Sequence, residues 1–208
     1  MPTTKIDIKK ELKELYNPET KIVSEVTVPN MNFLMIDGNG DPNTSKEFAD
    51  AIQALYPVAY TIKFMIKKST GYDFGVMPLE GLWWSDDMTD FSTGKKDDWY
   101  WTLMIMQPKV VTKEIYAKAL ADVKSKKNPL LIDKIRFESF EEGKSVQIMH
   151  IGPFAAEAPN IQKVHDRIKE LGGKFNGKIQ KHHEIYLSDL RRTAPEKLKT
   201  VVRQAYTK

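Results

Sequence analysis

The sequence repeats one order of predicted elements, and this duplication constrains the fold more than any other feature. Each half reads as strand, strand, helix, strand, strand, first over about residues 21–110 and again over about 133–206, with a connecting helix at about 112–126. A strand that ends just before Gly38 corresponds to one that ends before Gly152, and residues 80–86 correspond to 184–189 within one residue. Such a duplication implies a pseudo-two-fold axis with a cleft between the halves.

Turn signals and apolar periodicity set the bounds of the predicted elements. In the first half they predict strands at 21–28, 32–36, 73–84 and 98–106, a polar loop at 85–97, and a long helix capped by Thr44 or Ser45 and kinked at Pro57. In the second half they predict strands at 134–140 and 145–151, a helix at 157–171 and a strand around Glu184. The last segment, 197–206, is ambiguous between helix and strand, and the repeat favours a strand. Residues 1–20 form an N-terminal extension with a short amphipathic helix at 6–16.

One predicted strand carries an acid among apolar and aromatic residues. Successive side chains on a strand point to opposite faces, so Glu184 and Tyr186 share one face while Ile185 and Leu187 share the other. We expect the Ile185/Leu187 face to pack on a helix, which leaves Glu184 and Tyr186 on the far side of the sheet. A carboxylate beside a phenol in an aromatic recess is typical of a small-molecule site. The alternative is a surface strand on which Glu184 is simply solvated.

All four tryptophans gather on two neighbouring predicted strands. They are Trp83, Trp84, Trp99 and Trp101, and Tyr100 lies among them. Alternation puts Trp99 and Trp101 on one face of their strand and Tyr100 on the other. Such rings stack on planar or cationic ligands, with about 0.5–2 kcal/mol for each cation–π contact, but they also fill protein cores. Each ring is therefore a candidate ligand contact with core packing as its alternative.

Composition and missing motifs exclude several classes of function. The apolar runs are shorter than the roughly 20 residues of a membrane span, and no signal-peptide core follows Met1. The net charge of +4, spread over scattered lysines, does not indicate direct binding to nucleic acid. The absence of cysteine excludes disulfides and thiolate metal sites and fits a cytoplasmic protein. We expect no metal and no cofactor, because His182 and His183 point apart on a strand and there is neither a G-x-S-x-G elbow nor a Walker loop.

Two segments resemble a known family. Residues 183–189, with 191–201 behind them, resemble the closing motif of GyrI-like small-molecule-binding domains, and residues 148–154 are similar to that family's strand-to-helix transition. The resemblance covers roughly residues 20–206. It implies an α+β fold in which two β-α-β-β units lie side by side, with helices on one face and a ligand cleft on the other. It also places the family's central pocket glutamate at Glu184.

The resemblance implies a range of functions rather than one. Members of the family include the effector-binding halves of multidrug-responsive transcription regulators, a gyrase-inhibiting protein, and free-standing proteins. Some free-standing members hydrolyse the strained cyclopropane of DNA-alkylating natural products. Only about twenty residues precede the first predicted strand, so the regulators' DNA-binding helices have no counterpart. We expect a free-standing protein made of a single domain over 21–208, as a monomer or homodimer.

The sequence leaves two main hypotheses of function open. In the first, an ionised Glu184 and an aromatic wall bind a planar or cationic aromatic molecule without changing it. In the second, Glu184 is a general base that activates water against a strained ring, burial raises its pKa, and Tyr186 or an indole N–H stabilises the phenolate that forms. A third hypothesis is a protein that binds gyrase or another macromolecule. Glu80 is the first-half analogue of Glu184 and is either a second site acid or a surface charge. The candidate ligand contacts are Trp83, Trp84, Trp99, Tyr100, Trp101, Glu80 and His150.

Overall fold

The protein is described here by a computed structural model that covers residues 4–87, 94–189 and 191–208. It begins with an N-terminal segment that contains β1 (Thr4–Ile6), α1 (Ile8–Glu11) and α2 (Lys13–Tyr16). Two short helices thus replace the single helix predicted for 6–16, because the backbone at Leu12 leaves helical geometry, with φ −100° and ψ 36°. Strand β1 pairs in parallel with β4 (Tyr72–Phe74), which anchors the start of the segment.

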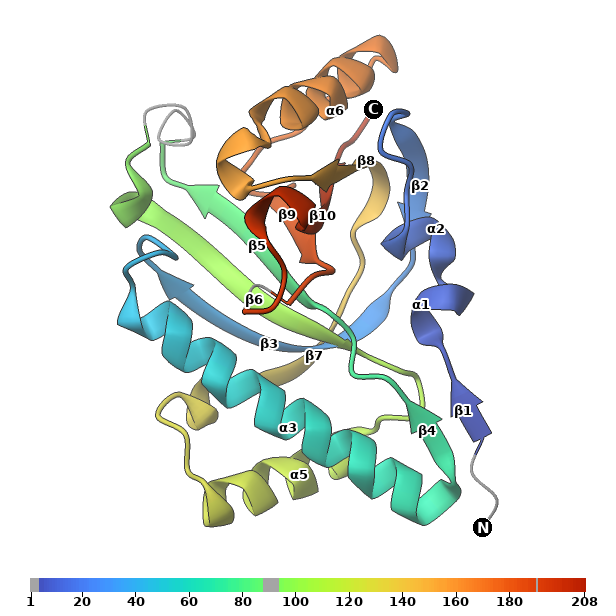
Figure 1. The fold of residues 1–208 in the computed structure, drawn as a ribbon, viewed down its shortest axis with the longest axis vertical. Helices are drawn as coiled ribbons and strands as arrows, with labels where there is room; N and C mark the ends of the chain where they lie inside the picture. Colours follow the sequence, from blue (N-terminus) through green and yellow to red (C-terminus); the bar gives the residue numbers. More distant parts are fainter. Residues whose placement is uncertain (1–3, 88–93, 190) are drawn as a thin grey trace.

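Eight strands form one curled antiparallel sheet through the middle of the molecule (Figure 1). Across the sheet their order is β2, β8, β10, β9, β5, β6, β3 and β7. Their bounds are β2 (Ser24–Val28), β3 (Met31–Asn39), β5 (Leu79–Ser85), β6 (Trp99–Gln107), β7 (Arg136–Phe140), β8 (Gly143–Ile151), β9 (His182–Tyr186) and β10 (Lys199–Ala205). The α+β class is confirmed, and the ambiguous last segment is the strand β10.

The order of the strands shows how the two repeats are joined. The first repeat supplies β2, β3, β5 and β6, and the second supplies β7, β8, β9 and β10. The third strand of each repeat, β5 or β9, lies at the centre, and the two pair with each other around the pseudo-two-fold axis. The first strands are exchanged, since β2 pairs with β8 of the second repeat and β7 pairs with β3 of the first. The exchange joins the two halves within one sheet.

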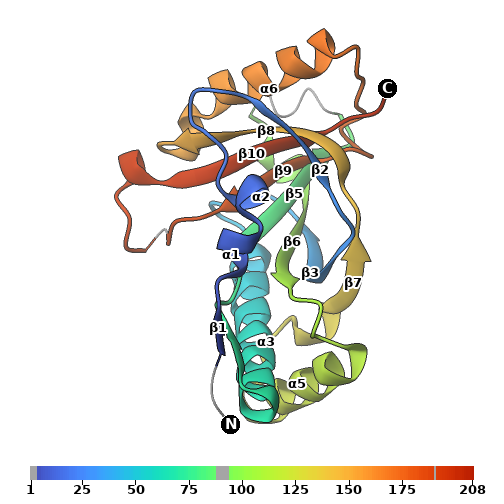
Figure 2. The same cartoon turned by 90° about the vertical axis from the view of Figure 1, so that its right-hand side faces the viewer.

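Three longer helices pack on one face of the sheet. They are α3 (Lys46–Thr70), α5 (Lys113–Lys126) and α6 (Ala158–Glu170). The hydroxyls of Ser45 and Thr112 cap α3 and α5, and α3 continues through Pro57. In Figure 2, α6 lies at the top of the view beside β8, and α3 and α5 lie at the bottom. The Phe48 ring of α3 packs edge-on against Trp101, while α6 shares a separate apolar cluster with β8 and β10.

The N-terminal segment covers the opposite face of the sheet, where it closes a buried polar network. In Figure 2, α1 and α2 lie in front of the strands. The Tyr16 hydroxyl donates to Glu80 at 2.8 Å, and His183 lies between Glu80 and Glu142, at 3.0 Å from each. Arg203 bonds to Glu142 at 3.1 Å and donates to the Leu15 carbonyl at 2.6 Å. The extension is therefore packed into the domain.

The strand predicted at 73–84 is divided. Its first residues belong to β4, outside the main sheet, and its last residues form β5. Gly75 and Pro78 lie in the break, where proline cannot donate to a strand ladder. The polar loop predicted at 85–97 lies partly outside the described residues.

Candidate active site

Glu184 lies on the face of the sheet that carries the helices. Its strand, β9, runs between β5 and β10, where Gly81 and Val202 are its cross-strand partners. Val202 belongs to the apolar cluster of α6, so Glu184 points to the same side as that helix. Ile185 pairs with Glu80 and points to the opposite face, toward the N-terminal segment. The predicted alternation is confirmed, and Ile185 packs in one apolar cluster with the short helices α1 and α2 of the N-terminal segment. The expectation that Glu184 points away from the helices is wrong, because α6 lies on its face of the sheet.

The side chains of Trp83, Tyr186 and His182 form a hydrogen-bond network around Glu184. The Trp83 indole N–H donates to the Tyr186 hydroxyl at 3.0 Å, and that hydroxyl donates to Glu184 Oε2 at 2.8 Å. His182 Nε2 lies 3.2 Å from the other carboxylate oxygen. The Glu184 side chain keeps 16% of its surface exposed, so part of it is accessible to solvent. The solvated surface strand is excluded, because most of this side chain is covered.

These hydrogen bonds reverse the expected shift of the Glu184 pKa. Burial by itself would raise the pKa of Glu184, but the hydrogen bond and charge of His182 and the hydroxyl of Tyr186 bring that pKa below its ordinary value. Burial and the nearby carboxylate raise the pKa of Tyr186 well above its ordinary value. At neutral pH the pair is therefore a carboxylate beside a neutral phenol, and the expectation of a raised Glu184 pKa is wrong.

A second acid, Glu157, adjoins Glu184 and was not identified as a site residue from the sequence. It lies just before the first residue of α6 and is only 3% exposed. Burial, the charge of Glu184 and a hydrogen bond to Glu184 raise the pKa of Glu157 to about 10. The sequence offers only the common signal of an acid at a helix start, which usually reports the helix dipole.

Aromatic rings from three elements surround Tyr186 and Trp83. Phe154 packs edge-on against Tyr186 with 5.6 Å between ring centroids, and Phe48 of α3 lies 5.8 Å from Trp83. Trp99 packs edge-on against Trp83 at 5.9 Å and is partly exposed. These rings form the aromatic wall of the site, with members Phe48, Trp83, Trp99, Phe154 and Tyr186.

Trp101 lies on the same face of the sheet as the aromatic wall, but it is buried in the core. It is fully buried, and a Cβ at Gly38 would come within 2.2 Å of its ring. This ring packs over Gly38 and edge-on against Phe48, between α3 and the sheet, so the core alternative fits Trp101.

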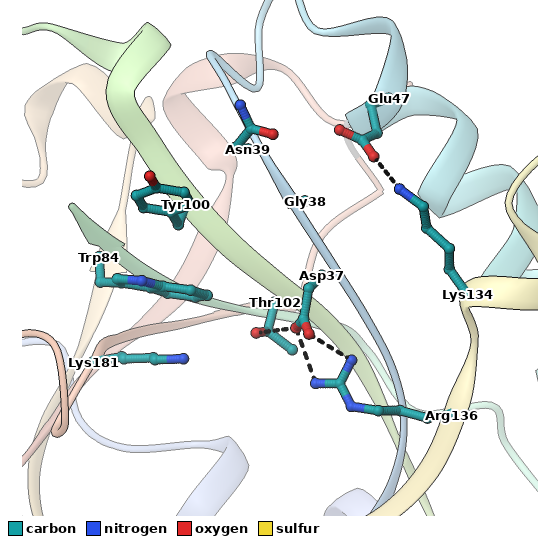
Figure 3. Close-up of a pocket in the computed structure, with 10 residues that line it drawn as sticks. All are labelled: Asp37, Gly38, Asn39, Glu47, Trp84, Tyr100, Thr102, Lys134, Arg136 and Lys181. Carbon is teal, nitrogen blue, oxygen red and sulfur yellow. Dashed lines mark hydrogen bonds and ion pairs between the residues drawn. The ribbon is translucent and has the colours of Figure 1, made fainter. Parts of the chain in front are cut away.

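The remaining aromatic candidates lie on the other face of the sheet. Trp84 stacks on Tyr100 with 5.8 Å between centroids, and Lys181 Nζ lies 3.3 Å from the Trp84 centroid (Figure 3). They line a polar cavity of about 380 Å³ that also includes Arg136, which forms a 2.8 Å ion pair with Asp37. This cavity is separate from Glu184, so the structure divides the predicted aromatic cluster between two places.

Glu80 and His150 are both held by other residues of the protein. Glu80 is fully buried in the polar network of the opposite face, so it is not a surface charge and does not join Glu184. His150 Nε2 bonds to the Pro153 carbonyl at 3.1 Å, and its Nδ1 bonds to the Asn160 amide at 3.1 Å. Both ring nitrogens of His150 therefore anchor the loop that brings Phe154 and Glu157 to the site.

Gly81 lies beneath the hydrogen bond between Trp83 and Tyr186, so a side chain at this position is expected to disturb the site. A Cβ at Gly81 would lie 2.7 Å from the Trp83 indole nitrogen and 3.0 Å from the Tyr186 oxygen. We expect Gly81→Ala to displace both groups and weaken ligand binding about tenfold or more, since about 1.4 kcal/mol corresponds to a factor of ten. Titration of a planar aromatic ligand measures this. Gly75→Ala is the control, because a Cβ there meets nothing within 4 Å; equal affinities for the two variants would contradict the prediction.

The described part of the chain contains neither a metal-binding cluster of side chains nor a helix that could span a membrane. Across residues 4–87, 94–189 and 191–208, no three His, Asp or Glu side chains are grouped so that they could hold a metal ion. None of the helices in those ranges has the length and apolar character needed to cross a bilayer.

Comparisons with known proteins find relatives that match nearly the whole chain. The family model of the GyrI-like small molecule binding domain matches residues 22–203. The crystal structure of an uncharacterized conserved protein from Listeria innocua is 42% identical, with a TM-score of 0.89, and the match covers 97% of this chain and 100% of that one. Two crystal structures of hydrolases from Listeria innocua are 42% and 41% identical, with TM-scores of 0.84 and 0.86, over 97% and 98% of this chain and all of theirs. A comparison with curated proteins found no match.

Proposed function

The chain belongs to the GyrI-like family of small-molecule-binding domains, and from this membership we propose that it binds a planar aromatic molecule at Glu184 and hydrolyses a strained, electrophilic ring within that molecule. One observation carries the proposal. Glu184 is a partly exposed carboxylate that is held by Tyr186 inside the aromatic wall. Such a site combines flat apolar surfaces with one oriented base, which suits a flat substrate and a single water molecule.

The reaction needs one base and one hydrogen-bond donor. Glu184 takes a proton from water, and the water oxygen forms a bond to a methylene carbon of a cyclopropane that is conjugated to a carbonyl group. The carbon–carbon bond of the ring breaks, and its electron pair moves through the conjugated system to the carbonyl oxygen, which becomes a phenolate. A protonated Glu184 no longer attracts the Tyr186 hydroxyl, so Tyr186 turns to the new oxyanion. The phenolate then takes up a proton from solvent and Glu184 releases to solvent the proton that it took from water, so the base is regenerated and the net change is the addition of one water molecule.

The hydrolase names of two Listeria relatives support chemistry over simple binding. The two hydrolases are about as similar to this chain as the uncharacterized Listeria protein is, and each matches nearly the whole length of this chain. Their names specify no substrate. The cyclopropane comes from the resemblance to free-standing family members, and water can open such a strained carbon electrophile with only a base and a donor.

A second candidate function is binding without chemistry. The lowered pKa of Glu184 favours it, because a carboxylate that is charged at neutral pH and surrounded by rings is also a site for a planar cation. In this case the protein sequesters or senses an aromatic cation.

An isotope experiment distinguishes the two functions. We would incubate the purified protein with a spirocyclopropane-bearing dienone in H₂¹⁸O and follow the products by mass spectrometry. Hydrolysis predicts a ring-opened alcohol that carries one ¹⁸O atom and forms faster than in buffer alone. Saturable binding without an ¹⁸O product would reject the hydrolase and leave the second candidate.

A further inference from the structure

Two buried carboxyl groups meet at this site without a permanent cation. Glu157 and Glu184 are within hydrogen-bonding reach of each other. Over the ranges that the structure describes, no lysine or arginine forms an ion pair with either acid. Two carboxylates that touch in a covered site repel strongly, so such a pair retains one proton.

The partners of the two acids decide which one keeps the proton. Glu184 accepts hydrogen bonds from Tyr186 and His182, which favour its charged form. Glu157 has the Thr200 hydroxyl as its other polar neighbour, and its Oε1 atom is buried without a hydrogen-bond partner. A carboxylate with so few donors is unstable in a covered site, whereas a carboxylic acid that donates to Glu184 is satisfied.

We propose that Glu157 is a positioning residue that holds the shared proton, donates it in a hydrogen bond to Glu184, and so keeps the charge and the orientation of Glu184 fixed. This role rests on the proposed function of Glu184 as the group that acts on the ligand. Glu157 reaches the site through the loop that His150 anchors, so the start of α6 is also a structural support for the base.

The shared proton defines the pH range in which the site is competent. Glu184 stays ionised to low pH, and Glu157 stays protonated until the pH approaches about 10. Above that pH a second negative charge faces Glu184, its third donor is lost, and we expect turnover to fall. The other titratable groups around the pair are His182 and Tyr186 on β9 and His150 on β8. His165 of α6 lies near His182, whose charge lowers the pKa of His165 in addition to the larger effect of burial.

A titration of the wild-type protein tests the proton directly and independently of any activity. With carbon-13 at the glutamate side-chain carboxyl groups, NMR separates protonated from ionised acids. We expect one carboxyl signal to stay in the protonated range from pH 6 to pH 9, and to be absent in Glu157→Gln. If every glutamate carboxyl of the wild type is ionised at pH 7, the proposal is overturned. This result stands whether or not the protein proves to be a hydrolase.

Turnover variants then test the positioning role. In Glu157→Gln an amide donates to Glu184 in place of the acid, so we expect less than about a tenfold loss at pH 7, well below the 10²–10⁴-fold typical of a residue that exchanges a proton with substrate. The alkaline loss of activity should disappear in this variant. Glu157→Leu, which lacks a donor, should lose more turnover at pH 7 than Glu157→Gln. The exposed acid Glu196 gives the control, Glu196→Gln, which should keep the wild-type profile.

Two results would overturn the positioning role. An unchanged alkaline loss in Glu157→Gln would assign that loss to another group. A loss of more than about 100-fold at every pH, in a variant with the wild-type melting temperature, would make Glu157 a proton donor to the substrate. If Glu157→Gln does not fold, the wild-type titration still decides whether a glutamate holds the proton.

Discussion

Glu184→Gln is expected to lower turnover of a strained-ring substrate by about 10²–10⁴-fold, the usual contribution of a general base. The substitution keeps the shape of the side chain and removes both its charge and its basicity. The fold should survive, because the site face is only partly covered and Tyr186 and His182 can each rotate or change tautomer to bond an amide. Steady-state kinetics and thermal melting on the same preparation measure the two effects.

A comparison with Tyr186→Phe sharpens this test. That variant keeps the ring against Phe154 and deletes the hydroxyl that bonds Glu184. It should bind a planar ligand nearly as well as the wild type but turn it over more slowly, since a donor to the developing oxyanion is lost. Wild-type turnover by Glu184→Gln would eliminate the general-base mechanism, and unchanged binding of a planar cation by the same variant would eliminate the charge-based binding candidate.

The sequence predicts Glu184 and its immediate neighbours well, because their arrangement is local. Alternation along one strand is enough to place Glu184 beside Tyr186, and the repeat is enough to make the last segment a strand. Alternation cannot say which face the helices cover. The N-terminal segment covers the other face, where Tyr16 bonds to Glu80 across 64 residues of chain, and no local pattern encodes this contact.

The components of the site that the sequence does not reveal come from distant elements. Glu157 precedes a helix and Glu184 lies on a strand 27 residues later, so only the folded chain shows two acids in contact. Whether the pKa of Glu184 is raised or lowered likewise depends on how many hydrogen-bond donors surround its carboxylate. Burial alone predicts a rise, and the hydrogen bonds from His182 and Tyr186 reverse it. A sequence pattern can indicate that an acid is buried, but it does not show how many hydrogen-bond donors the folded chain places around that acid.

The largest loss of stability is expected from Arg203→Met, which keeps most of the side-chain length and removes the charge. Arg203 is 1% exposed and bonds to Glu142, to the Gln147 side chain at 2.9 Å and to the Leu15 carbonyl. The variant leaves Glu142 buried with His183 as its remaining ionic partner and leaves Leu15 without its donor. Breaking one side of a buried ion pair costs about 3–5 kcal/mol. At roughly 2–4 °C per kcal/mol for a chain of this size, the melting temperature should fall by about 6–20 °C.

Arg191→Met is the matched control, because Arg191 is exposed and pairs with Asp189 at 2.9 Å. An exposed pair contributes about 0–1 kcal/mol, so this variant should melt within a few degrees of the wild type. Urea denaturation of the three proteins gives the free energies of unfolding. A similar, small loss in both variants would show that the buried network is not a major source of stability.

The same network predicts how the stability of the wild type depends on pH. Although burial opposes its charge, Glu142 and Glu80 raise the pKa of His183 to about 9, so its contribution is complete below pH ~6.5 and is lost as the pH rises through about 9. His183 and Arg203 outweigh burial at Glu142 and lower its pKa to about 2, so its contribution is complete above about pH 4.5 and is lost as the pH falls toward 2. The network therefore contributes most to the free energy of unfolding between about pH 5 and 6.5, and its contribution declines on both sides. Glu157, whose pKa is raised to about 10, separately lowers the free energy of unfolding as the pH rises above about 4.5. In His183→Gln the alkaline decline should become shallower, because no imidazolium remains to lose its proton, and an alkaline slope identical to that of the wild type would show that His183 is neutral in the folded protein.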